Sequence, residues 1–198
     1  MNVTRYTINK LKIIVGLGNP GEKYKKNRHN VGCMFVEHFL ETYNAKRVAQ
    51  NVNRFKMDKY LQSEVVTLHD TRFALHDLVI IKPQTYMNKS GEAVAACVKR
   101  YALHDLRSEL IIVHDDLDIP FGKFKIQTQG PKAHNGLTDI QNKLQTMDFL
   151  RIRIGVDNRP AVNRMQGEEY VLQNFTEEEA HQLPAIFAEI ASRLTPFL

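Results

Sequence analysis

The chain has 198 residues, of which 43% are hydrophobic and 25% are charged, and this is the composition of one globular domain with a sizeable core. It contains no apolar run long enough to cross a bilayer, and its N-terminal segment lacks the features of a signal peptide. We therefore expect a cytoplasmic protein without membrane contacts, with an organelle interior as the alternative. Lys and Arg number 27 against 22 Asp and Glu, and this excess favours a polyanionic partner.

The two cysteines, Cys33 and Cys97, both fall on the apolar side of predicted helices. We interpret them as buried, reduced thiols, because neither a disulfide nor a nucleophilic role is indicated by their positions. The sequence has no second cysteine pair and no His-x-x-x-His spacing, which argues against a zinc site.

The first half of the chain alternates between strand and helix patterns. Residues 11–17 are almost continuously apolar and β-branched, which predicts a buried strand. From Asn30 onward the apolar residues follow a helical stripe. Residues 54–82 alternate weakly and predict two or three strands, the last of them at 78–81, and residues 89–103 return to a helical period.

The second half begins with an apolar strand at 109–114, which we expect to end in an acidic turn at 115–120. A further strand is predicted near 123–128, a helix from about Asn135, and a strand at 151–156 that carries cations at alternate positions. The order of elements predicts a mixed or mostly parallel sheet in one α/β domain that spans residues 1–198, with helices on both faces.

The C-terminal part of the chain predicts a loop and a helix. Residues 157–170 are polar and irregular, and they are the best candidate for a mobile loop. Thr176 and Glu179 have the spacing of a capping box that opens a last helix. Pro184 lies inside this helix, and we expect it to kink or divide the helix.

Residues 16–21, Gly-Leu-Gly-Asn-Pro-Gly, match the dinucleotide fingerprint G-x-G-x-x-G after a strand. However, Pro20 stiffens the position where a helix should open, and the acidic ribose ligand expected about 20 residues later has only Glu37 or Glu41 to offer. We therefore interpret the segment as a turn that needs positive φ angles and presents Asn19. A nucleotide-dependent oxidoreductase remains the less favoured alternative.

His29 is the first candidate for a catalytic group, because it stands at a helix start directly after a run of cations. An imidazole has an ordinary pKa of about 6.5 and is the side chain best suited to act as a base near neutral pH. Asp115, the first residue after a predicted strand, can hold His29 in one tautomer and stabilise its protonated form. The same acidic segment is also compatible with a site for a hard metal cation or with a solvated turn.

Two further polar segments follow the pattern of a strand end or a helix start. Asn88 lies in the loop at 82–91, where its carboxamide can both donate to a carbonyl and accept from a water molecule. Alternatively, Asn88 or Ser90 serves as an N-cap of the following helix. Asn135 opens a predicted helix, whose free N–H groups favour an anion or a carbonyl oxygen, and it is itself a candidate N-cap. In open α/β sheets such segments meet beyond the carboxyl ends of the strands.

In chain order these motifs closely resemble those of bacterial-type peptidyl-tRNA hydrolases. The resemblance extends from about Lys12 to the C-terminal helix. The segments that carry it are Gly16–Gly21 with Tyr24, Arg28-His29-Asn30, Lys82–Gly91, His114–Pro120, His134-Asn135-Gly136-Leu137 and Arg151–Gly155.

The resemblance implies a single α/β domain with a twisted mixed sheet. It also implies hydrolysis of the ester that joins a peptide to the 3′-terminal ribose of tRNA, which recycles tRNA from prematurely released peptidyl-tRNA. The family implies an enzyme that works as a monomer, without metal or cofactor, on the acceptor arm and 3′ end of peptidyl-tRNA.

Residue roles are carried over by motif. His29 matches the family's general base and Asp115 the acid that orients it. Asn19 and Asn88 match carboxamides that hold the peptide carbonyl and the attacking water.

Three further residues match substrate contacts of the family. Asn135 matches a residue that positions water or substrate, Tyr24 a contact near the tRNA 3′ end, and Arg153 a cation that contacts a tRNA phosphate. The sequence departs from the family at Lys132-Ala133, where two glycines are usual, and bulkier residues there would narrow a groove. An RNA-binding protein that kept the fold and lost hydrolysis is therefore an alternative.

Overall fold

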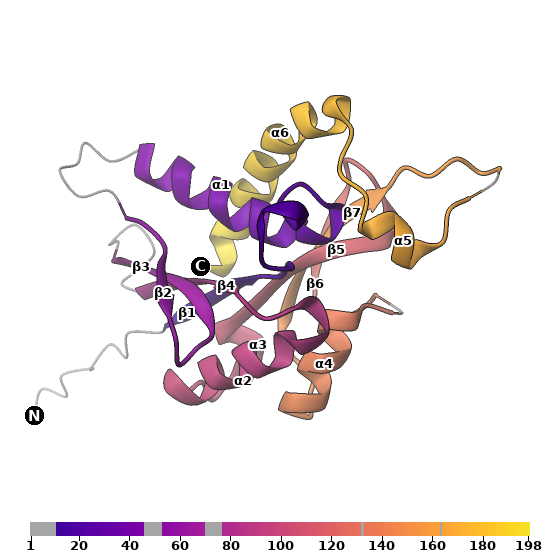
Figure 1. Ribbon diagram of the computed structural model, residues 1–198. Coiled ribbons are helices and arrows are strands. Elements are labelled where there is room, and N and C mark those ends of the chain that lie inside the picture. The colour runs from indigo at the N-terminus through magenta and orange to yellow at the C-terminus, as the bar shows by residue number, and fades with distance from the viewer. Residues whose placement is uncertain (1–10, 46–52, 70–76, 132, 163) are drawn as a thin grey trace, which may run out of the picture.

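The computed structural model describes residues 11–45, 53–69, 77–131, 133–162 and 164–198. In these ranges the chain builds one seven-stranded sheet with the strand order β2-β3-β4-β1-β5-β7-β6 (Figure 1). The strands are β1 Lys12–Gly16, β2 Lys56–Asp58, β3 Ser63–His69, β4 Asp77–Pro83, β5 Leu110–Pro120, β6 Phe124–Gln127 and β7 Leu150–Asp157.

The sheet is mixed, and its centre is parallel. β4, β1, β5 and β7 pair in parallel, with Ile14 of β1 opposite Ile80 of β4 and Ile111 of β5. β3 and β6 run antiparallel to their neighbours at the two sides. The predicted α/β class, with a mixed and mostly parallel sheet, is confirmed.

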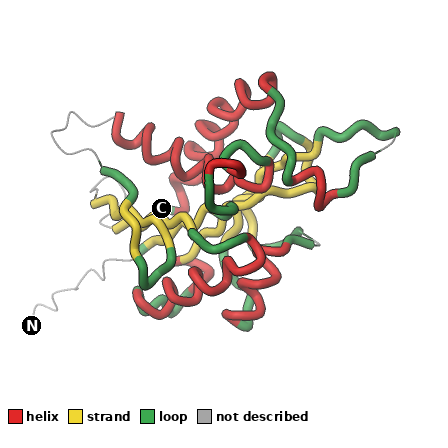
Figure 2. Tube along the Cα trace, viewed as in Figure 1, coloured by secondary structure: helices red, strands yellow, loops and turns green. Residues whose placement is uncertain are grey.

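Helices cover both faces of the sheet (Figures 1 and 2). One face carries α1 and α6, and the other carries α2, α3 and α4. The α-helices are α1 Val31–Ala45, α2 Ser90–Arg100, α3 Leu106–Glu109, α4 Asn135–Leu144, α5 Gly167–Val171 and α6 Glu177–Leu194, and short 3-10 helices lie at η1 Glu22–Tyr24, η2 Arg28–Asn30, η4 Met87–Lys89 and η5 Thr195–Phe197.

Each face of the sheet has its own hydrophobic core. On the α1 and α6 side, the rings of Phe35 and Phe187 meet edge to face with centroids 5.8 Å apart. On the α2 and α4 side, Val94 and Ile140 belong to one buried cluster with Ile13. Because both faces are covered, the central strands contain continuous apolar runs, such as Ile13–Val15 in β1 and Leu78–Ile81 in β4, and this is why they could be recognised.

A close approach of α1 to the sheet sets the position of the functional residues. A Cβ atom on Gly32 would lie 2.3 Å from the carbonyl oxygen of Val113 on β5, so only glycine fits there. The turn between β1 and α1 is tied to the same strand, because the amide of Leu17 donates to that oxygen at 2.9 Å. The segment that carries His29 therefore lies against β5.

The glycine-rich turn at 16–21 has the expected backbone at only one of its glycines. Gly21 has a φ of +102°, whereas Gly16 and Gly18 are required because there is no room for a Cβ atom at either position. A Cβ on Gly16 would lie 2.5 Å from the carbonyl oxygen of Gly32, and one on Gly18 would lie 2.7 Å from Sγ of Cys33. The turn packs against the start of α1 and presents Asn19.

β5 is longer than predicted, and this corrects the interpretation of residues 115–120 as an acidic turn. The strand runs to Pro120, because its second half continues to pair with β7, with Asp115 opposite Ile154. A register shift follows between Asp116 and Pro120. Asp115 is thus held inside the sheet and not in a turn after it.

The C-terminal helix α6 is continuous from Glu177 to Leu194, although Pro184 was expected to kink or divide it. Its capping box is formed as predicted, with Thr176 and Glu179 bonded reciprocally. An internal proline costs a helix about 3 kcal/mol. The burial of Leu183 and Phe187 against the sheet face offsets this cost and keeps the helix in one piece.

Two short helices were not predicted, namely α3 and α5, and α5 occupies part of the loop expected at 157–170. Cys97 is buried and Cys33 is half-buried, and both are free thiols. Burial raises the pKa of each to about 12, which fits the expected unreactive thiols. None of the helices in the described ranges combines the length and the apolar character of a membrane span.

Candidate active site

A cavity of about 790 Å³ opens beside β5 where β1 and β4 have ended. It brings together residues from distant parts of the sequence, because the carboxyl ends of parallel strands share one edge. Its lining includes six residues that the sequence singled out: Asn19, Tyr24, His29, Asn88, Asp115 and Asn135.

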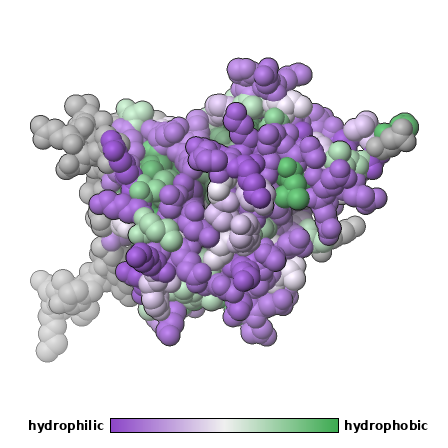
Figure 3. Space-filling model, viewed as in Figure 1, coloured by the Kyte–Doolittle hydropathy of each residue, from purple (hydrophilic) through white to green (hydrophobic). Residues whose placement is uncertain are grey.

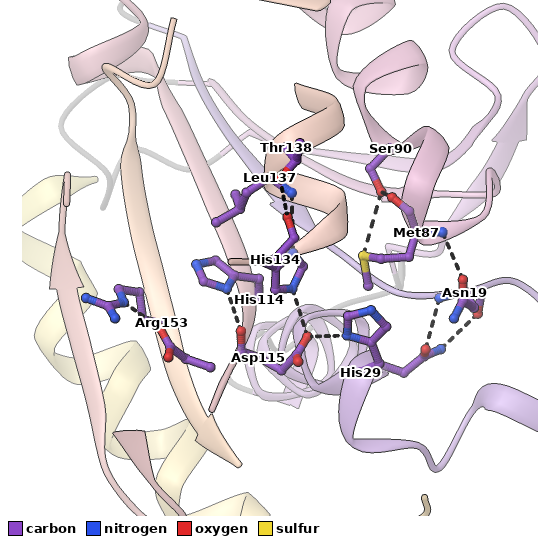
Figure 4. Close-up of polar contacts among 12 residues, drawn as sticks. Asn19, His29, Met87, Ser90, His114, Asp115, His134, Leu137, Thr138 and Arg153 are labelled. Atoms are coloured by element: carbon purple, nitrogen blue, oxygen red, sulfur yellow. Dashed lines mark hydrogen bonds and ion pairs between the residues drawn. The ribbon is translucent and has the colours of Figure 1, made fainter. Parts of the chain in front are cut away.

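His29 and Asp115 form a buried pair at the bottom of this cavity (Figure 4). Nδ1 of His29 lies 2.7 Å from Oδ1 of Asp115, and the side chains are 10% and 3% exposed. The carboxylate accepts a hydrogen bond from Nδ1–H of the neutral ring, so Nε2 is left with a free lone pair. This is the arrangement of an imidazole base oriented by an acid.

Each member of the pair shifts the pKa of the other. Burial opposes the charge on His29, but the neighbouring Asp115 carboxylate outweighs it and raises the pKa of His29 above its ordinary value. Burial also disfavours the Asp115 carboxylate, yet the nearby imidazoles of His29 and His134 hold the pKa of Asp115 far below its usual range. Asp115 is therefore ionised throughout the neutral range.

His134 is a second imidazole on the same carboxylate oxygen, and the sequence analysis did not assign it a role. Its Nε2 lies 3.0 Å from Oδ1 of Asp115, while its Nδ1 accepts a bond from the amide of Leu137 at 3.3 Å. Because Nδ1 accepts, the proton of the neutral ring is on Nε2 and is donated to Asp115. His134 is also the N-cap of α4, so the alternative in which Asn135 caps this helix is wrong.

His114 holds the backbone of Asp115 from the other side. Its Nδ1 donates to the carbonyl oxygen of Asp115 at 2.6 Å, and its ring meets that of His134 at a centroid distance of 4.8 Å. Complete burial and the adjacent His134 lower the pKa of His114 to about 3. His114 is therefore neutral at neutral pH, and its role is to support the Asp115 main chain.

Asn19 is fixed by hydrogen bonds that leave one donor group for the cavity. Its Oδ1 accepts from the amide of Met87 at 2.8 Å, and its own amide and carbonyl are both bonded to the Asn30 side chain at 2.9 Å. With Oδ1 occupied, the NH₂ group of Asn19 remains as a donor at the cavity wall (Figure 4). Asn88 and Asn135 also line the cavity, and their side chains are exposed.

Aromatic side chains line another part of the cavity. Tyr24 is half-buried, and its ring lies edge to face with that of Tyr86 at a centroid distance of 6.4 Å. Lys23 places its Nζ 4.6 Å above the ring of Tyr24. Such a combination of exposed rings and cations suits a nucleotide.

Arg153 is not brought into the cavity. It is 6% exposed, its Nε donates to Oδ2 of Asp116 at 2.6 Å, and one of its Nη atoms donates to the carbonyl oxygen of Gln129 at 3.2 Å. The guanidinium therefore braces β5 and the loop before α4. Of the Lys132-Ala133 pair, Ala133 lines the cavity, and Lys132 lies outside the described residues.

His29, Asp115 and His134 are also the one group among the described residues whose ligand atoms, all within 4.8 Å of one another, are close enough to share a metal ion. Their geometry fits hydrogen bonds better. Zinc binds N and O atoms at about 2.0–2.2 Å in a tetrahedron, which sets them more than 3 Å apart. Here the two N···O distances are 2.7 and 3.0 Å, and Nε2 of His134 carries a proton.

Comparison with known proteins identifies the family. The family model for peptidyl-tRNA hydrolase matches residues 13–198. The peptidyl-tRNA hydrolases of Chloroflexus aggregans and Thermodesulfovibrio yellowstonii are 38% and 40% identical to this chain, over 90% and 89% of its length and 88% and 87% of theirs. The crystal structure of the Acinetobacter baumannii peptidyl-tRNA hydrolase is similar at a TM-score of 0.76 and 29% identity, over 94% of this chain and 89% of that chain. The chain belongs to the peptidyl-tRNA hydrolase family.

Proposed function

We propose that this chain hydrolyses the ester between a peptide, or an N-blocked aminoacyl group, and the 3′-terminal ribose of tRNA, with His29 as the general base. The observation that carries the proposal is the 2.7 Å contact of His29 with an ionised, buried Asp115 at the bottom of a cavity. Family membership supports the substrate class.

In the proposed mechanism Nε2 of His29 takes a proton from water while the water oxygen attacks the ester carbonyl carbon. Asp115 stabilises the imidazolium that forms, and a positioned base of this kind contributes about 10²–10⁴-fold in rate. The NH₂ group of Asn19 donates to the developing oxyanion. When the tetrahedral intermediate collapses, the carbon–oxygen bond to the ribose breaks and the imidazolium returns its proton to the ribose oxygen.

The remaining cavity residues would hold the substrate. Asn88 and Asn135 lie where exposed carboxamides can bind the attacking water and the peptide backbone, and Tyr24 lies where a ring can contact the 3′-terminal nucleotide. The acceptor arm would bind over the exposed lysines next to Tyr24. The contact of Arg153 with a tRNA phosphate stays a prediction, and binding there would have to compete with Asp116.

We further infer that residues 1–198 act as one hydrolase domain, as a monomer in the cytoplasm, without a metal ion or cofactor. The contacts at Asp115 support hydrolysis without a metal ion, because each imidazole uses the nitrogen nearest to Asp115 for a hydrogen bond. Hydrolysis should therefore survive EDTA.

The test is release of tRNA from N-acetyl-aminoacyl-tRNA with EDTA present. Wild type should turn over, His29→Ala should lose nearly all of the rate, and His181→Ala, which removes an exposed imidazole on α6, should not. Wild-type turnover by His29→Ala would show that the base is another group. Salt-sensitive tRNA binding without ester cleavage would show that the chain is an RNA-binding protein.

A further inference from the structure

The cavity and the surface beside it differ in charge. Next to Tyr24 the exposed side chains of Lys23, Lys25 and Lys26 lie on and after η1. None of these lysines lines the cavity, whereas the wall formed by α5 brings Glu168 to it. The segment after α5 pairs with the one after η1, since the amide of Phe175 donates to the carbonyl oxygen of Lys26 at 3.1 Å, and α5 is labelled in Figure 1. A polyanion is therefore attracted to the lysines outside the cavity, whereas the cavity wall that carries Glu168 repels it.

Glu168 lies on the face of α5 that is turned to the cavity. Residues three and four positions apart share one side of a helix, and Glu168, Val171 and Leu172 all line the cavity. Tyr170 points elsewhere, because it is buried with its ring 4.4 Å from the guanidinium carbon of Arg28. Glu169 is exposed and does not line the cavity. Figure 3 shows a hydrophobic group near α5 that is surrounded by hydrophilic residues.

The carboxylate of Glu168 makes no hydrogen bond or ion pair with any part of the chain that the structure describes. The arginines of the neighbouring loop are engaged elsewhere, since Arg159 and Arg164 both bind the carboxylate of Asp157. The other acid in the cavity lining, Asp115, is buried and bonded to two imidazoles. Glu168 thus carries an uncompensated negative charge next to apolar side chains.

We propose that Glu168 makes the hydrolysis selective for the charge of the peptide, so that esters of cationic residues react faster than esters of acidic residues. The inference rests on the proposed function. Phosphates are attracted to the lysines near η1 and repelled by α5, which leaves the α5 wall, with Val171 and Leu172, for the peptide. An amine or guanidinium on the peptide is attracted by the carboxylate of Glu168, and a carboxylate on the peptide is repelled by it.

The experiment uses one tRNA acylated in turn with N-acetyl-lysine, N-acetyl-glutamate and N-acetyl-glutamine, so that the nucleic acid is constant. We compare kcat/KM for the three esters with wild type, Glu168→Gln and the matched control Glu169→Gln. Exposed charge pairs have modest energies, so we expect the ratio of lysyl to glutamyl ester to fall roughly two- to fivefold in Glu168→Gln. The wild-type ratio should also shrink at high salt.

The outcomes are distinct. A ratio that falls in Glu168→Gln and not in Glu169→Gln supports the proposal. An equal ratio in wild type and Glu168→Gln overturns it, and so does an equal fall in both variants, which would report only the net charge of the protein. Absence of hydrolysis of all three esters by wild type would instead contradict the proposed function.

Discussion

Oδ1 of Asp115 lies 2.7 Å from Nδ1 of His29, although 86 positions separate the two residues in the chain. The same oxygen also binds Nε2 of His134 at 3.0 Å. One buried carboxylate therefore holds two imidazoles, and it leaves Nε2 of His29 free at the cavity. This relationship leads to the first two predictions.

The first prediction concerns pH. Because Asp115 raises the pKa of His29 above 6.5 and the base must be neutral, kcat/KM should rise with pH through a value above 6.5. Asp115→Asn removes the charge, so the pKa of His29 should fall, and the acidic limb of the profile should move to lower pH while the maximal rate drops. Profiles of kcat/KM between pH 5 and 9 for wild type and Asp115→Asn measure the position of the acidic limb. An acidic limb that stays in place would contradict the assignment.

The second prediction separates the two roles of His134. His134→Ala removes both the bond to Asp115 and the cap of α4, and loss of a cap costs about 0.5–2 kcal/mol of unfolding free energy. Asparagine is a good N-cap but is too short to reach Asp115. His134→Asn should therefore recover stability in urea unfolding while hydrolysis remains as slow as in His134→Ala. Recovery of both would mean that His134 acts only as a cap.

The third prediction concerns Asn19. Asn19→Asp keeps an acceptor for the amide of Met87 but replaces the NH₂ donor by a charged oxygen. Removal of one oxyanion donor typically costs 10²–10³ in kcat. We expect a loss of about this size in kcat with a nearly unchanged urea midpoint. Asn142→Asp, at an exposed position on α4, is the control and should hydrolyse at the wild-type rate.

The fourth prediction concerns the buried ion pair of Arg28, the residue directly before His29. Arg28 binds Glu179 at 2.7 Å, and both side chains are about 5% exposed or less. Removing one partner of a buried pair costs about 3–5 kcal/mol, because the other charge stays buried. Arg28→Met should lower the unfolding free energy by about this amount. Arg193→Met breaks the exposed pair with Glu189 and should cost less than about 1 kcal/mol.

The same pair predicts the acid dependence of stability. Burial opposes the Glu179 carboxylate, but its bond from Arg28 prevails and lowers the pKa of Glu179 below its ordinary value. Its stabilisation is therefore present above about pH 4.3 and is lost as the pH falls through the lower pKa of the folded state. In urea unfolding, the free energy of unfolding should fall less between pH 7 and pH 3 in Glu179→Gln than in wild type. An equal fall in the two proteins would contradict the contribution of Glu179 to acid sensitivity.

Local patterns predicted the class of the fold and most of its elements. The central strands are buried on both faces, so their apolar runs are visible without any tertiary information. The capping box at Thr176 was recognisable because its two bonds are local. The length of β5 was missed, since residues 115–120 stay extended only by pairing with β7. Pro184 does not divide α6 for a similar reason, because packing outweighs its local cost.

The sequence by itself also indicated which residue types carry the chemistry. A histidine that follows a run of cations, and asparagines that follow predicted strands, can both be read from neighbouring residues. Tertiary structure alone decided that Asp115 serves two imidazoles, that His134 and not Asn135 caps α4, and that Arg153 is buried against Asp116. The physical reason is that hydrogen bonds and burial depend on atoms brought together from distant segments, whereas helix and strand periods are properties of neighbouring residues.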